Sequence, residues 1–212
     1  MDVKHLGWYN CTMSVYKIND IFSKSELETL YGLIDSIVIP IKADGTYLYD
    51  TEDTLSTCTI SRSLGRLQAS FKAPDGVCLR LFDVVKQTHP EKMTVSGATY
   101  VEYSKKYGTP DLPPHFDGDG SDLIVNYQVS SNTSWDIGVN LETYNMEDNS
   151  ALVFDPNKNI HWRTHKDFKK DEYVRMIFFR LQRLDSDIDN SHLRYSLDHE
   201  IYKDVNAFRD SL

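Results

Sequence analysis

The residues best suited to chemistry lie in Leu-Pro-Pro-His-Phe-Asp-Gly-Asp-Gly, residues 112–120. His115 and Asp117 are separated by one residue, so on an extended backbone their side chains point to the same side. An imidazole nitrogen and a carboxylate oxygen then meet at one point. A further histidine would complete a two-histidine, one-carboxylate triad, which binds Fe(II) and leaves coordination positions open.

Two histidines later in the chain can supply the third ligand. His161 lies 44 residues beyond Asp117 in Asn-Ile-His-Trp-Arg, after the apolar run Ala151–Phe154 and a turn. His165 stands four residues further, beside the Lys- and Asp-rich segment 166–170. We expect His161 to be the ligand because it follows a predicted strand and has apolar neighbours. His165 is the alternative.

Arg175 is a charged residue inside a run that otherwise has the pattern of a core strand. It shares a strand face with Ile177 and Phe179. A guanidinium buried there is costly unless it meets an anion. We therefore expect Arg175 to bind a buried carboxylate or phosphate, which can belong to a ligand or to a core glutamate.

The composition is that of one globular domain. The chain has 212 residues, 40% of them hydrophobic and 26% charged. Its net charge of −9 and the lack of a Lys/Arg-rich stripe disfavour nucleic acid as a partner. We predict a single domain, 1–212, with helical and loop support over 1–93, a β core over 94–182 and a C-terminal extension over 183–212.

Cysteine usage and the N-terminus indicate the compartment. The three cysteines, Cys11, Cys58 and Cys78, have no metal-binding spacing, which indicates free thiols in a reducing environment. The N-terminus lacks the apolar core of a signal peptide, and no stretch approaches the ~20 apolar residues of a membrane helix. We expect a cytoplasmic protein without a membrane partner, in which the Asn10 and Asn132 glycosylation motifs are unused. The oligomeric state is not predicted.

Two helices are predicted before residue 93. The first begins at a capping box formed by Ser23 and Glu26 and ends before Pro40. The second runs from about Asp75 to Thr88. Apolar residues at helical spacing are Leu27, Leu30, Tyr31 and Ile34 in the first helix and Val77, Leu81, Val84 and Val85 in the second.

Short strands with turn signals between them dominate the rest. Strands that follow one another without helices predict an antiparallel sandwich or barrel, with the two helices packed on one outer face. We also expect a surface loop over 42–57 and a last helix near 197–208. The predicted strands are Met13–Ile18, Ala98–Tyr103, Leu123–Val129, Trp135–Leu141, Ser150–Phe154 and Tyr173–Gln182.

Taken together, these residues resemble the Fe(II)/2-oxoglutarate-dependent dioxygenases and, more loosely, their prolyl-hydroxylase-like branch. That family has His-x-Asp after one strand, a second histidine several strands later, and a basic residue beyond it. His115, Asp117, His161 and Arg175 match this order, and the resemblance spans about 94–182. The spacing departs from the family pattern, in which the basic residue stands about ten positions after the distal histidine. Arg175 is fourteen positions after His161 and ten after His165, and no glycine precedes it.

The resemblance implies a fold that is mainly β with flanking helices, on a double-stranded β-helix (jelly-roll, cupin-like) core. It implies hydroxylation of a C–H bond of a peptide side chain or small metabolite, with succinate and CO2 as co-products. The metal ligands would be His115, Asp117 and His161. Arg175 and Tyr103 would bind the cosubstrate 2-oxoglutarate. Replacements for these two anchors are Tyr100 or Tyr127 for Tyr103 and Arg163 or Arg180 for Arg175.

Two other functions stay open from the sequence. One is a jelly-roll binding or structural module that has no catalytic metal. The other is a metal-dependent hydrolase or isomerase on a cupin-like barrel, which would leave Arg175 without a 2-oxoglutarate partner. Turnover of 2-oxoglutarate separates the oxygenase from both, and metal content then separates those two.

Overall fold

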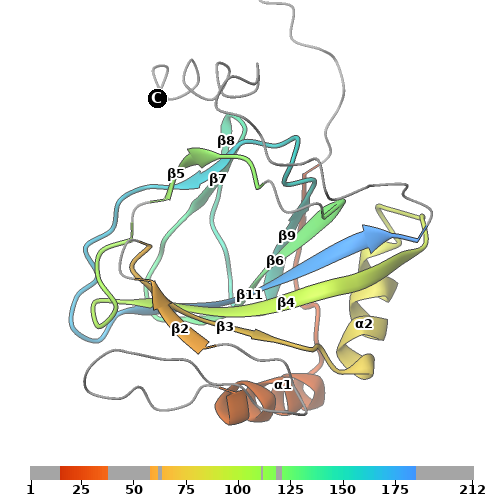
Figure 1. Cartoon of the computed structure of the whole chain (residues 1–212), viewed down its shortest axis with the longest axis horizontal. Coiled ribbons are helices and arrows are strands. Elements are labelled where there is room, and N and C mark those ends of the chain that lie inside the picture. The colour runs from red at the N-terminus through yellow and green to blue at the C-terminus, as the bar shows by residue number, and fades with distance from the viewer. Residues whose placement is uncertain (1–14, 38–57, 62–63, 111, 118–120, 185–212) are drawn as a thin grey trace, which may run out of the picture.

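The computed structural model describes residues 15–37, 58–61, 64–110, 112–117 and 121–184. In these residues eleven strands form two antiparallel sheets, accompanied by two helices (Figure 1). The large sheet has the order β1-β9-β6-β11-β4-β3-β2, and the small sheet has the order β5-β10-β7-β8. The elements are β1 Tyr16–Ile18, α1 Lys24–Ile37, β2 Cys58–Ser61, β3 Arg66–Phe71, α2 Asp75–Val85, β4 Met93–Ser104, β5 Leu112–His115, β6 Leu123–Ser131, β7 Ile137–Val139, β8 Glu142–Tyr144, β9 Ser150–Phe154, β10 His161–Arg163 and β11 Tyr173–Arg183.

Both helices form where the sequence predicts them. The Ser23 backbone N–H donates to Glu26 Oε2 at 2.7 Å, and the Glu26 N–H donates to Ser23 Oγ at 3.4 Å, which is a capping box. Helix α2 begins at Asp75 as expected but ends at Val85, and a turn continues to residue 88. Of the described residues, no helix is long and apolar enough to cross a membrane.

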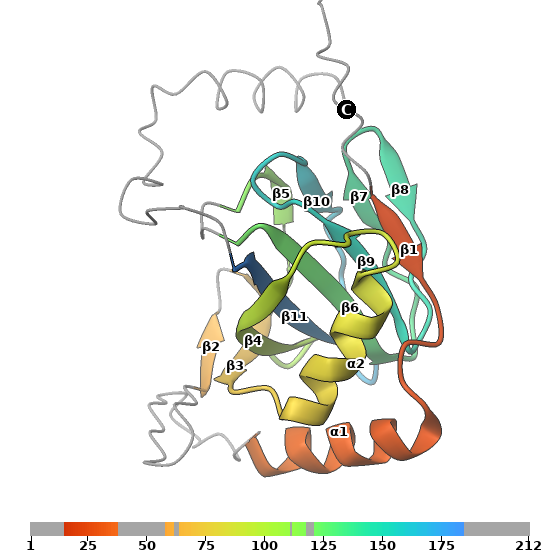
Figure 2. The same cartoon turned by 90° about the vertical axis from the view of Figure 1, so that its right-hand side faces the viewer.

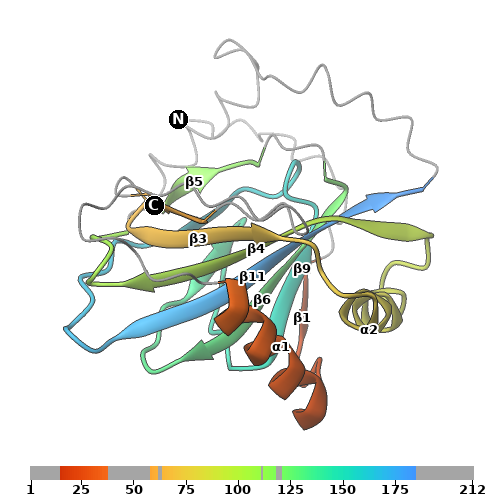
Figure 3. The same cartoon turned by 60° about the horizontal axis from the view of Figure 1, so that its bottom comes forward.

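The large sheet is covered on both faces. Its helix face packs against α1 and α2 in a cluster that joins Leu30 and Leu81 to Ile177 and Phe179 of β11. Figures 2 and 3 show the two helices on this side of the sheet. The opposite face, called here the interior face, looks toward the small sheet, and two smaller apolar clusters fill part of the space between the sheets. The expected packing of both helices on one outer face is confirmed.

The strand predictions are confirmed most closely in the β core. Strand β9 has its predicted bounds, and β4, β6 and β11 contain their predicted ranges. The strand expected over Trp135–Leu141 is shorter, Ile137–Val139. Strands β2, β3, β5, β8 and β10 were not among the predicted strands. The expected loop over 42–57 and the expected helix over 197–208 lie outside the described residues.

Candidate metal centre

Three potential metal ligands meet between the sheets. His115 ends β5, Asp117 follows two residues later, and His161 begins β10. Strands β5 and β10 are antiparallel neighbours, and His161 is directly opposite His115 in the register. The ligand atoms of the three residues lie within 4.8 Å of one another. Asp117 Oδ1 is 3.5 Å from His115 Nε2 and 3.5 Å from His161 Nε2.

Backbone carbonyls fix the orientation of both imidazoles. His115 Nδ1 is 2.7 Å from the Pro113 carbonyl oxygen, and His161 Nδ1 is 3.1 Å from the Asn159 carbonyl oxygen. Because a carbonyl oxygen only accepts hydrogen bonds, each Nδ1 carries the proton. In the neutral imidazole each Nε2 then keeps a lone pair on the side of Asp117, where a metal ion can lie between nitrogen and carboxylate, which is the usual arrangement of histidines that bind metals.

Asp117 is held in place and ionised. Its backbone N–H donates to the Pro156 carbonyl oxygen at 3.0 Å, which ties it to the turn between β9 and β10. Burial raises the pKa of the Asp117 carboxyl, but the interactions of the carboxylate with the His115 and His161 imidazoles outweigh burial and hold that pKa well below its usual range. The carboxylate is therefore charged at neutral pH, as a metal ligand must be.

The donor set fits Fe(II). Two imidazole nitrogens and one carboxylate oxygen on one side of a site form the facial triad of non-haem iron enzymes. Ligands about 2.1 Å from a metal and at right angles to one another would lie about 3 Å apart. The two Nε2–Oδ1 separations are 3.5 Å each, which is only slightly longer than this spacing. His115, Asp117 and His161 thus have the donor types and the approximate spacing of a metal site.

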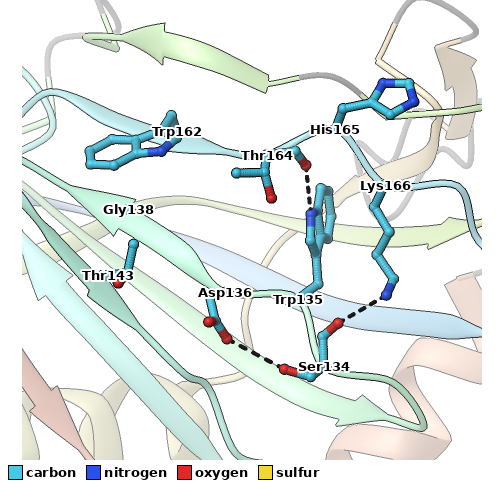
Figure 4. Close-up of a pocket in the computed structure, with 9 residues that line it drawn as sticks. All are labelled: Ser134, Trp135, Asp136, Gly138, Thr143, Trp162, Thr164, His165 and Lys166. Atoms are coloured by element: carbon cyan, nitrogen blue, oxygen red, sulfur yellow. Dashed lines mark hydrogen bonds between the residues drawn. The ribbon is translucent and has the colours of Figure 1, made fainter. Parts of the chain in front are cut away.

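The alternative ligand, His165, lies apart from this centre. It is exposed, and its Nε2 is 3.6 Å from Asp167 Oδ1. It lines a cavity of about 340 Å³ at the small sheet, together with Trp162 and Gly138 (Figure 4). The cavity floor includes Gly138, against which the Trp162 indole lies.

Arg175 is also outside the centre. It lies on the helix face of β11, and its Nε donates to Glu102 Oε2 at 3.0 Å. Its side chain is 43% exposed, so the expected deep burial is wrong, although the expected need for an anion is met by a glutamate of the protein. The face shared with Ile177 and Phe179 is as expected, but that face packs on the helices rather than on the space between the sheets.

A different guanidinium lies between the sheets. Arg163 shares the interior side of β10 with His161 and is buried. It donates to the Trp135 carbonyl oxygen and to Met176 Sδ at 3.2 Å, and it stacks 4.7 Å from the centroid of the Trp135 ring. Burial lowers the pKa of Arg163 to about 10, so the group is still charged at neutral pH.

Tyr103, expected to bind the cosubstrate, is fully buried on the interior face of β4. Its ring packs edge-on against Trp135 with centroids 4.8 Å apart. Its hydroxyl oxygen accepts a hydrogen bond from Arg66 Nη1 at 3.1 Å. The hydroxyl proton of Tyr103 is thus left to donate elsewhere. Tyr100 and Tyr127, the replacements considered for it, lie in the cluster on the helix face.

Two positioning residues were not foreseen from the sequence. Asn159 is buried, and its side chain bridges the Asp155 carbonyl oxygen at 2.8 Å and the Asn140 amide at 2.8 Å. These two hydrogen bonds fix Asn159, whose carbonyl oxygen accepts the hydrogen bond from His161 Nδ1. Arg66 lies on β3, a strand that was not predicted. For Asn159, the available signal is its position two residues before His161. For Arg66, it is the alternation of polar and apolar residues over Arg66–Phe71, which is typical of a strand with two different faces.

Comparison with known proteins places the fold. No family model and no curated protein matches the sequence. Among solved structures, the chain is similar to the non-haem α-ketoglutarate-dependent carbocyclase SnoK from nogalamycin biosynthesis, with a TM-score of 0.59, 9% identity and coverage of 87% of each chain. It is also similar to the epimerase SnoN from the same biosynthesis, with a TM-score of 0.57, 7% identity, and 81% of this chain and 79% of that chain covered.

A third similar structure contains ligands. HygX from Streptomyces hygroscopicus, solved with nickel, 2-oxoglutarate and hygromycin B, has a TM-score of 0.52 and 8% identity, over 82% of this chain and 84% of that one. The resemblance to Fe(II)/2-oxoglutarate-dependent enzymes is therefore confirmed at the level of the fold. The class that fold and site define is a double-stranded β-helix protein with a His-Asp-His centre suited to iron.

Proposed function

We propose that the protein is an Fe(II)/2-oxoglutarate-dependent oxygenase that hydroxylates a C–H bond of a small metabolite or peptide side chain. The observation that carries the proposal is the convergence of His115, Asp117 and His161, with both Nε2 atoms presented to one carboxylate. A metal bound there would supply open coordination positions at which a 2-oxo acid and oxygen react.

The protein's part is to hold these ligands in a fixed and partly enclosed place. Pro113 and Asn159 orient the imidazoles through their carbonyl oxygens. The Phe154 ring packs against the His161 ring, with the two centroids 5.2 Å apart, and places an apolar group beside the metal ligands. Such preorganisation reduces the reorganisation needed when the metal and cosubstrate bind.

We further propose that Arg163 and Tyr103, not Arg175, bind the distal carboxylate of 2-oxoglutarate. Arg163 is buried on the same side of β10 as His161, and the hydrogen-bond partners it has among the described residues are neutral. An anion beside it would offset the cost of a buried guanidinium. The proton of the Tyr103 hydroxyl can complete the contact, because its oxygen already accepts from Arg66.

Consumption of 2-oxoglutarate tests the function. The purified protein with Fe(II), ascorbate and air should convert 2-oxoglutarate to succinate, slowly without a prime substrate, and Asp117→Ala should not. A wild-type protein that binds Fe(II) but turns over no 2-oxoglutarate, with or without a broad panel of small molecules and peptides, would contradict the proposal. It would leave a metal-binding module or a metal-dependent hydrolase or isomerase.

A further inference from the structure

Strand β3 presents a polar stripe to the space between the sheets. Its residues alternate between two environments: Leu67, Ala69 and Phe71 are buried in the cluster on the helix face. The residues between them are Arg66, Gln68 and Ser70, which are only partly buried and belong to the interior face. These three residues, called here the β3 stripe, lie beside β4, where Arg66 is opposite Tyr103.

Arg66 is the charged member of the stripe, and the hydrogen-bond partners it has among the described residues are neutral. Nη1 donates to Tyr103 Oη at 3.1 Å, and Nε donates to Gln68 Oε1 at 3.0 Å. A guanidinium has five N–H donors. These two contacts therefore orient the planar fork and leave other donors for a ligand. Planar, oriented guanidinium groups are well suited to carboxylates and phosphates.

The position of Arg66 separates its role from that of Arg163. Arg163 is 4% exposed and lies on the small sheet, whereas Arg66 keeps partial exposure on the large sheet. The two sheets face each other across the metal ligands, and Tyr103 connects Arg66 to the packed group around Trp135. A cosubstrate that reaches Arg163 and Tyr103 would occupy the deeper part of this space. The β3 stripe would then face a molecule nearer to solvent.

We propose that the β3 stripe binds the prime substrate and that this substrate carries a carboxylate or phosphate group recognised by Arg66. The inference rests on the proposed function, because an oxygenase of this kind binds a prime substrate in addition to 2-oxoglutarate. The net charge of −9 repels anions from the protein as a whole, so a preference for an anion must come from a local group such as Arg66. Gln68 and Ser70 add neutral hydrogen-bonding groups along the same wall.

Paired probes that differ only in charge test this inference. Protein loaded with Ni(II) and saturating 2-oxoglutarate is titrated with benzoate, phenyl phosphate and the neutral benzamide, and binding is followed by ligand-observed NMR. We expect the two anions to bind about tenfold more tightly than benzamide, the gain typical of one charge-assisted contact. Arg66→Gln should remove this preference, and Arg66→Lys should keep part of it because the charge remains without the fork.

Arg175→Gln is the matched control, because it removes the same charge from the helix face of the large sheet. It should leave the preference for anions unchanged. Equal binding of benzoate and benzamide by the wild type, or equal losses in Arg66→Gln and Arg175→Gln, would overturn the inference. A loss of 2-oxoglutarate affinity in Arg66→Gln, with probe binding intact, would assign Arg66 to the cosubstrate and also overturn it.

The inference and the proposed function fail in different ways. The same titrations on metal-free protein report on Arg66 whether or not iron chemistry occurs. If the wild type bound neither metal nor 2-oxoglutarate but still preferred benzoate through Arg66, the proposed function would be wrong and the anion site would stand. Melting curves for each variant show whether a lost preference reflects misfolding, in which case Arg66→Lys decides.

Discussion

Arg175 and Glu102 form an ion pair across neighbouring strands, with Nε and Oε2 3.0 Å apart, on the face of the large sheet that packs on the helices. The hydroxyls of Tyr100 and Tyr107 donate to the same carboxylate at 3.0 and 3.3 Å. Glu102 is thus surrounded by donors, and the Arg175 charge is compensated within the protein. The next residue of β11, Met176, faces the other way and contacts Arg163.

This relationship predicts opposite effects for two arginine substitutions. Arg163→Met should keep the fold, since an apolar side chain of similar length suits that buried site. It should weaken 2-oxoglutarate binding to the metal-loaded protein by on the order of 2–5 kcal/mol, about 30-fold or more. Arg175→Met should leave that affinity unchanged and lower the melting temperature, because Glu102 would lose its cation. Calorimetric titration of 2-oxoglutarate into Ni(II)-loaded variants measures both; the reverse pattern would return the role to Arg175.

Two substitutions decide whether His161 or His165 is the third metal ligand. His161→Ala should abolish metal binding, because it removes one of three ligand atoms that lie within 4.8 Å of each other. His165→Ala should bind metal as the wild type does, since that imidazole is exposed and contacts Asp167 instead. Metal content after dialysis against a weak chelator, measured by atomic emission, compares the two. Retained metal in His161→Ala would mean that the centre is built differently.

Much of the fold could be predicted because local and tertiary signals agree. The Ser23–Glu26 capping box predicted the start of α1, and the alternation of strand and turn signals after residue 94 predicted the β core. Strand β3 was missed although Arg66 to Phe71 alternates between polar and apolar residues, as a strand with two different faces should. Short strands such as β8, with three residues, carry too little pattern to detect.

For the site, the residue types and their spacing indicated the metal ligands. They did not indicate toward which face of the large sheet the Arg175 side chain points. His115 and Asp117 were placed together because one intervening residue fixes their shared side. Arg175 was expected to be buried because its strand neighbours are apolar, and the family resemblance implied that it faces the cosubstrate. In a sheet covered on both faces, however, an apolar neighbour does not say which face is the interior. The identity of the interior face depends on how the helices pack. Ile177 illustrates this, because it lies in one apolar cluster with Leu30 of α1 and Leu81 of α2.

The carboxylate of the triad should be indispensable to the metal. Asp117→Ala removes the only negative ligand of the three, so two neutral imidazoles would have to hold a divalent cation. We expect the wild type to give a weak visible charge-transfer band with Fe(II) and 2-oxoglutarate under anaerobic conditions, and the variant to lose it. Asp117→Glu is the informative companion, because its longer side chain keeps the charge and displaces the oxygen. A wild type that binds no divalent metal at micromolar concentration would refute the metal centre itself.

The last prediction concerns Gly138, which packs against Trp162, the residue that follows the metal ligand His161. Gly138 of β7 lies under the Trp162 indole so closely that a Cβ built on it would be 2.1 Å from Trp162 Cε2. Gly138→Ala must therefore push the indole or β10 away, at a cost of about 1–3 kcal/mol for overpacking. Because His161 precedes Trp162 on β10, we expect weaker metal binding as well as a lower melting temperature. Gly97→Ala is the control within a strand, since nothing lies within 4 Å of a Cβ at that position. If both variants melt and bind metal alike, the contact between Gly138 and Trp162 does not position His161.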